Sequence, residues 1–192
     1  MTSNTPSQTA PATSTSGRLA HAAGLGALLG AAASLVMAAF AMMAAATYQS
    51  AGFFTPLYHI ASTFISPSTM VTSMQHAAGG STFYFAFGPA VLGAIVHMMI
   101  GAMYGAIFAI AASLLHLRGP VLIAAGAAWG AIVFVISSFI ALPIAAALFS
   151  SGDQISQMAS KVGYGTFLTE HVLFGLALAA LLASRRPFAR SE

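Results

Sequence analysis

Apolar residues run almost without interruption through four long stretches of the chain, near residues 20–46, 88–114, 120–149 and 165–184. Each stretch is long enough to cross a hydrocarbon core of roughly 30 Å, which takes about 20 helical residues. Continuous apolar runs differ from the alternating pattern of a membrane barrel, so each run is predicted to be a helix. The pattern therefore predicts an all-α polytopic membrane protein, a four-transmembrane-helix bundle.

Polar residues gather at the chain ends. Residues 1–18 are rich in Ser, Thr, Pro and Ala, and we predict a disordered N-terminal tail there. We expect the membrane domain to occupy residues 19–186 and a cytoplasmic tail to occupy 187–192. The first apolar run exceeds the roughly 7–15 residues of a typical secretion signal, which favours a retained helix over a cleaved one.

The connection 48–87 contains no Asp, Glu, Lys or Arg, so we expect it to lie on or in the membrane surface. Thr55 and Ser66 each precede a proline, which is typical of a helix start, and Thr55 is the predicted N-cap. Asp153 is the predicted N-cap of a short helix in the last connection. Pro143 is expected to bend the third apolar run.

Small residues recur at a spacing of four within the apolar runs. Residues four apart lie above one another on a helix, and a stripe of small residues lets a neighbouring helix come close. His97 continues one such stripe. We predict that these stripes pack the helices through Gly26, Gly30, Gly93, Gly101, Gly105, Gly126, Gly130 and Gly175.

The two halves of the chain resemble each other. Segments 26–30 and 126–130 both begin and end with glycine, and small residues follow His97 and His171 at the same spacing. We predict an internal repeat of two tandem helical hairpins, in which His97 corresponds to His171. Chance is the alternative, because such spacing is frequent in membrane helices rich in Gly and Ala.

The order His97-xxx-Gly101-xxx-Gly105 resembles the H-x-x-x-G-x-x-x-G helix of small, uncharacterised bacterial four-span membrane proteins. The resemblance covers mainly residues 90–110. It implies a four-span fold and carries over no activity, cofactor or site residue.

Composition and charge agree with a membrane location. Charged residues make up 5% and apolar residues 58% of the chain, which leaves too little polar surface for a soluble fold. With four spans, only Lys161 falls on one side, and the other side holds Arg18, Arg118, Arg185, Arg186 and Arg190. The positive-inside rule then places both termini in the cytoplasm, and we expect the bacterial inner membrane.

The expected partners follow from the same composition. A net charge of +3 does not indicate nucleic acid, so the expected surroundings are the lipid bilayer, with a second copy of the chain or another membrane protein as partner. The absence of cysteine excludes disulfides and thiol chemistry.

Three ionisable residues lie inside predicted spans. His97 lies roughly 14 Å into its helix, and Glu170 and His171 lie roughly 8–9 Å into theirs, at about 1.5 Å per residue. A carboxylate in hydrocarbon is costly unless it is neutral, paired or hydrated. We predict a polar intramembrane site of these three residues that relays a proton, holds a cation or binds a polar solute. The alternative is structural, since a buried histidine can simply donate to a backbone carbonyl.

His59, His76 and Asp153 are further candidates from the outer connections. No catalytic triad or carboxylate pair is evident, so no catalytic residue is assigned and an enzyme is not favoured. The leading function is transport or permeation of a small solute or ion. An accessory or scaffold subunit is the alternative, and a metal or redox protein is the third. We expect no cofactor, and whether a metal binds is left open. Transport predicts a polar cavity open to one side, whereas a scaffold predicts a packed interior and an exposed glycine stripe.

Overall fold

The computed structural model describes residues 15–185, and within that range all regular structure is helical. Four helices are long and apolar enough to cross a membrane: α1 (Thr15–Thr47), α4 (Phe87–Leu114), the segment Gly119–Phe149, and α9 (Tyr164–Arg185). The predicted all-α fold with four spans is confirmed.

The start of α1 differs from the prediction. Residues 15–18, expected to be disordered, already belong to this helix, because the turn that contains them continues directly into the apolar run. The rest of the predicted N-terminal tail and the tail 187–192 lie outside the described residues.

The third span is divided into α5 (Gly119–Ile136), η1 (Ser137–Ala141) and α6 (Leu142–Phe149). Pro143 lies in the first turn of α6 and has no N–H to donate to the preceding turn. The π-helical turn η1 comes immediately before it, and local π geometry is one way in which a membrane helix accommodates proline. The interruption that Pro143 predicts therefore takes the form of a π turn.

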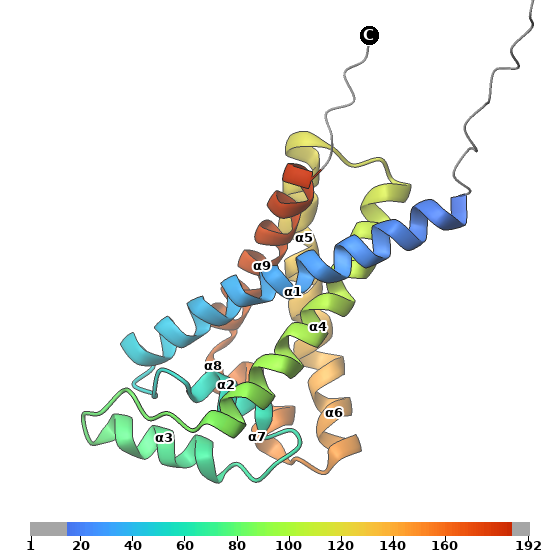
Figure 1. Cartoon of the computed structure of the whole chain (residues 1–192). Coiled ribbons are helices and arrows are strands. Elements are labelled where there is room, and N and C mark those ends of the chain that lie inside the picture. The colour runs from blue at the N-terminus through green and yellow to red at the C-terminus, as the bar shows by residue number, and fades with distance from the viewer. Residues whose placement is uncertain (1–14, 186–192) are drawn as a thin grey trace, which may run out of the picture.

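Four short helices complete the described chain, α2 (Thr55–Ala61), α3 (Ser68–Ala78), α7 (Asp153–Ser156) and α8 (Met158–Val162). They lie together at one end of the bundle. The 115–118 turn, the N-terminal end of α1 and the C-terminal end of α9 lie at the other end (Figure 1). We call these the short-helix end and the terminal end.

Two predicted helix caps are wrong by one residue. Thr55 and Asp153 are the first residues of α2 and α7, so the cap positions fall to Phe54 and Gly152. The Thr55 hydroxyl instead lies 2.9 Å from the Ser73 hydroxyl of α3. A tertiary hydrogen bond between two short helices has taken the place of the local capping bond.

The first of two close helix crossings joins α1 to α4. A side chain at Gly30 would collide with the Gly101 carbonyl, and one at Gly26 would collide with the Gly105 carbonyl and the Ala109 methyl. The backbones are in direct contact here, so only glycine fits. Gly26 and Gly30 therefore lie in a close helix contact, and their contribution to holding the bundle together stays a prediction.

The second crossing joins α5 to α9 in the same way. A side chain at Gly126 would collide with the Gly175 carbonyl and the Ala179 methyl, and one at Gly130 with the His171 carbonyl. Each crossing therefore has two glycines on the earlier helix, set against a small-residue face of the later one.

The register of these contacts differs from the predicted one by one helical turn. Gly105 and Gly175 occupy matching places, so His171 corresponds to Gly101 and not to His97. Gly93 makes a different contact again, because a side chain there would collide with the Leu57 carbonyl of α2. The stripe on α4 thus serves two neighbours, α1 near Gly101 and α2 near Gly93, a division that spacing along one helix does not reveal.

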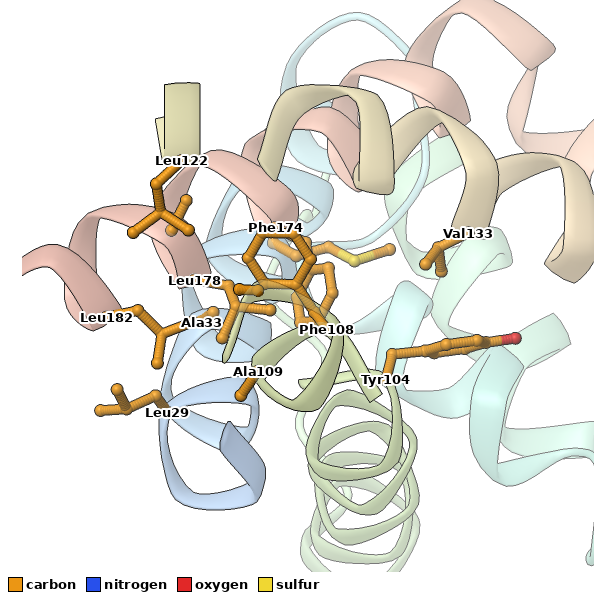
Figure 2. Close-up of a cluster of buried hydrophobic side chains, with 13 residues drawn as sticks. Leu29, Ala33, Tyr104, Phe108, Ala109, Leu122, Val133, Phe174, Leu178 and Leu182 are labelled. Atoms are coloured by element: carbon orange, nitrogen blue, oxygen red, sulfur yellow. The ribbon is translucent and has the colours of Figure 1, made fainter. Parts of the chain in front are cut away.

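The spans are arranged so that α1 packs against both α4 and α9, while α5 packs mainly on α9. Towards the terminal end all four contribute to one apolar core (Figure 2), whose members include Leu29, Phe108, Leu122, Phe174 and Leu178. This core closes the terminal end of the bundle. The short-helix end is built differently, around a cavity.

Candidate functional site

A cavity of about 860 Å³ lies between the spans on the short-helix side of the core. Its walls come from all the described helices, α1 to α9 and η1, and they are mostly apolar. The predicted polar residues His97, Glu170 and His171 all line it. The tertiary structure therefore brings the three together on one internal surface, as the depth argument expected; their role stays a prediction.

The His97 side chain links two spans. Its Nε2 lies 2.9 Å from the Ser34 carbonyl oxygen of α1. Because a carbonyl oxygen only accepts, Nε2 must carry the proton and donate it. In the neutral imidazole this leaves Nδ1 as a hydrogen-bond acceptor.

The His171 side chain bonds to its own helix. Its Nδ1 lies 2.7 Å from the Phe167 carbonyl oxygen one turn earlier, so Nδ1–H donates and Nε2 is the remaining acceptor. The centroid of its ring lies 4.5 Å from that of Phe167 and 6.2 Å from that of Phe134 on α5. The imidazoles of His97 and His171 are near enough to interact electrostatically.

The Glu170 side chain is only 5% exposed, and within the described part of the chain it makes no hydrogen bond or ion pair. Buried carboxyl groups without a partner are rare in membrane helices, because the carboxyl group loses its hydration without compensation. Glu170 faces the cavity, so its partner has to come from whatever occupies that space, water or ligand.

Among the outer candidates, only His59 lines the cavity. Its Nε2 lies 2.6 Å from the Gln154 carbonyl oxygen and so donates between α2 and the start of α7. Burial lowers the pKa of His59, and the nearby Lys161 ammonium lowers it further. His76 and Asp153 do not line the cavity.

His76 and Asp153 lie away from the cavity because of their positions in the short helices. The His76 ring stacks on Tyr84, with ring centroids 4.8 Å apart, and Asp153 begins α7 at the outer end. No group of three or more His, Asp or Glu side chains in residues 15–185 is close enough to hold a metal ion. The residues that line the cavity surround a space wider than a single ion.

Sequence reasoning missed several lining residues with polar groups, among them Tyr104 and Lys161. The Tyr104 ring belongs to the apolar core while its hydroxyl points away from the other side chains of that cluster (Figure 2). Lys161 is exposed on α8. Its position as the one basic residue on its side of the membrane was the available signal for Lys161, and a phenol inside an apolar helix was the signal for Tyr104.

The four apolar spans and the internal cavity define the class: the chain is a small multi-pass integral membrane protein. No protein-family model, curated protein or solved structure matches it. Its function has to be argued from the cavity itself.

Proposed function

We propose that this protein is a small transporter whose cavity is the substrate site, with Glu170, His97 and His171 as its polar centre. The observation that carries the proposal is the buried Glu170 carboxyl group, which lines a cavity of about 860 Å³ and has no partner among the described residues. An ionisable group kept inside a membrane at this cost is typical of a substrate or proton pathway.

The asymmetry of the bundle supports the same function. The cavity lies on the short-helix side, while Leu122, Phe174 and Leu178 belong to the core that fills the terminal end. A site that lies towards one side of the membrane, with packed side chains between it and the other side, fits one of the two states that alternating access requires.

The scaffold alternative is weaker on the same evidence. It expects glycine faces that are free to bind another protein, but Gly26, Gly30, Gly126 and Gly130 are all consumed in contacts within the chain. These glycines already have a structural role, which is to pack the helices of the chain against one another. The cavity has no such role, and it is therefore the better candidate for the functional feature.

We further propose an orientation in the bacterial inner membrane with the terminal end in the cytoplasm. Arg18, Arg118 and Arg185 lie at that end and Lys161 lies at the other, which fits the positive-inside rule. Because the chain has no cysteine, single-cysteine variants carry no background. An impermeant thiol reagent applied outside should label Ser81→Cys and not Leu115→Cys, and the reverse result would invert the orientation.

The two matching crossings also support an internal repeat with the corrected register. A repeat axis along the membrane normal would relate α1 and α4 to α5 and α9, as in transporters built from parallel repeats. The core and the cavity would then lie between the two related hairpins.

Alternating access can be tested without knowing the substrate. In vesicles, Ala41→Cys in the cavity wall should react with an impermeant thiol reagent from the short-helix side. Ala112→Cys lies in the core, where the native residue is fully buried, and should react only from the terminal side and more slowly. This slow reaction would report the second state.

Two results would contradict transport. If Ala112→Cys never reacts while Ala41→Cys does, the terminal end does not open and the cavity is a binding site only. If both variants react from both sides, the proteins are unfolded or form an open pore, and alternating access is wrong.

A further inference from the structure

The cavity reaches the side of the bundle between α4 and the η1–α6 segment. Met99 and Met103 of α4 line it and are 67% and 51% exposed, and Ala141 of η1 lines it from the facing segment. Contacts between α4 and α5 are few, so these two spans do not seal this side. In a membrane-spanning bundle, side chains exposed at this level face lipid, and the opening therefore faces the hydrocarbon.

The polar groups inside the cavity present hydrogen-bond acceptors. The N–H groups of His97 and His171 already donate to carbonyl oxygens, which leaves one ring nitrogen of each as an acceptor. A carboxyl oxygen of Glu170 also accepts, whether the group is neutral or ionised, and it has no partner in residues 15–185. A ligand that satisfies this set has to supply donors, and a positively charged ligand would stabilise the ionised form of Glu170.

The walls indicate the rest of the ligand. Methionines contribute much of the apolar lining, together with the aromatic rings of Phe167 and Phe174; they are Met37, Met70, Met74, Met99, Met103 and Met158. Flexible thioethers adapt to ligands of different shape. The volume of about 860 Å³ lies within the range of about 300–1,000 Å³ for sites of small organic molecules.

One cation also borders the cavity and favours a different ligand. Lys161 is exposed on α8 and close enough to His59 to affect its charge, which puts it at the edge of the cavity near the short helices. An anion could bind there, at the edge. The buried position of Glu170 and the acceptors around it favour a cation in the interior.

We propose that the cavity binds a lipid-soluble primary amine in its ammonium form, which enters sideways from the hydrocarbon between α4 and η1–α6. The proposal rests on the proposed function and names its substrate class. The ammonium would donate to Glu170 and to the imidazole acceptors, and the apolar body would lie against the methionines.

Binding tests the ligand class. The full-length protein in lipid nanodiscs is dialysed against 1-naphthylmethylamine, against its trimethylammonium analogue without N–H donors, and against 1-naphthylacetate, with empty nanodiscs subtracted. We expect the primary amine to bind best. Glu170→Gln should weaken that binding by at least about tenfold, the order of a lost charge-assisted hydrogen bond. Asp153→Asn is the matched control, because Asp153 lies outside the cavity, and should leave binding unchanged.

Two outcomes would overturn the ligand class. If 1-naphthylacetate binds best and Lys161→Gln abolishes this binding, the site prefers anions to cations. Equal binding of the primary amine to the native protein and Glu170→Gln would mean that the carboxyl group does not recognise it. The melting temperature of each variant is measured as well, and binding is compared only among variants that are folded at the temperature of the experiment.

The lateral route has its own matched pair on neighbouring segments. Ala141→Trp places a bulky ring at the opening, whereas Ala147→Trp places the same ring on an exposed site of α6 that does not line the cavity. We expect Ala141→Trp to slow association of the amine severalfold and Ala147→Trp to leave the rate unchanged. Equal rates in the two variants would exclude entry at this opening.

These results are distinguishable from failure of the transport proposal. Amine binding without reaction of Ala112→Cys would leave a correctly assigned ligand class in a protein that does not transport. Reaction of Ala112→Cys without amine binding would leave a transporter for another class of solute.

Discussion

The two glycine crossings use the same backbone contact but continue differently towards the short-helix end. At the α1–α4 crossing, the matching place one turn beyond Gly105 is Gly101, and His97 then donates across to the Ser34 carbonyl. At the α5–α9 crossing, the same place is His171, which bonds to Phe167 of its own helix. The first pair is tied together beyond the crossing, and the second is not.

This difference shows how one helix pair can be a rigid support while the other carries the chemistry. The cross-helix bond of His97 fixes α4 against α1. The hydrogen bond of His171 lies within α9 and Glu170 makes none in residues 15–185, so both can change hydrogen-bond partners without breaking a bond between two helices. If the protein changes conformation, we expect α9 and α5 to move relative to a fixed α1–α4 pair.

The largest expected effect comes from filling the crossings. Gly30→Leu and Gly175→Leu place a side chain against backbone atoms of the facing helix, and backbone cannot give way. Each should destabilise the bundle by about 3 kcal/mol, the upper part of the usual overpacking range. Unfolding in a titration with sodium dodecyl sulfate, followed by fluorescence of the single tryptophan, would measure it.

Each crossing offers a control on the same helix. Gly24 on α1 and Gly165 on α9 have no atom within 4 Å of an added Cβ. Gly24→Leu and Gly165→Leu should therefore be close to neutral. A loss of stability as large as that of the crossing variants would mean that the glycine contacts do not hold the bundle together.

A smaller effect should separate the two histidines. His97→Leu removes a bond between helices, which contributes about 0.6–1.7 kcal/mol in membrane proteins. His171→Leu removes a bond within α9, and separated helices in a membrane keep such local bonds, so it should contribute less to assembly. The same detergent titration compares them, and a larger loss for His171→Leu would reverse the assignment of support and chemistry.

The smallest effect concerns the short helices that border the cavity. Burial keeps the pKa of His59 below its ordinary value of 6.5, so the folded state holds it neutral while the unfolded chain protonates it. Stability from His59 is complete above pH 6.5 and decreases as the pH falls below that value. The melting temperature of the native protein should thus fall between pH 7.5 and pH 5.5 by a degree or so more than that of His59→Gln.

His59→Gln is suitable for this test because glutamine keeps a donor for the Gln154 carbonyl but does not titrate. The comparison of the two proteins removes the contributions of groups that titrate independently of His59. Identical pH dependence of the two melting temperatures would mean that His59 is not buried neutral against α7.

The hydrophobic pattern predicted the spans because a membrane leaves few choices. Backbone N–H and C=O groups must form hydrogen bonds within each segment, so every long apolar run becomes a helix. The helices begin and end close to the predicted positions. The number of spans then puts the ends of α1 and α9 on the same side as Arg118. The ionisable residues in those spans could also be identified as candidates, because side chains such as Glu170 and His97 are costly when they face the hydrocarbon.

What the sequence could not decide was the rotation and register of each helix against its neighbours. Small-residue spacing says that a helix can be approached closely, but it does not say by which partner, and so Gly93 was grouped with Gly101 although it meets α2 instead of α1. The same uncertainty of one turn matched His97 with His171.

The cavity is the property that only the tertiary structure decided. Local periodicity fixes a helix and its apolar residues, because the energy terms involved act over a few neighbouring residues. An empty space between helices depends on side chains from segments far apart, from Met37 on α1 to Phe174 on α9, and on which faces the close crossings leave turned inward. The sequence by itself thus determined the four helices and their polar residues, and packing of the whole chain determined that Glu170 faces a cavity instead of lipid.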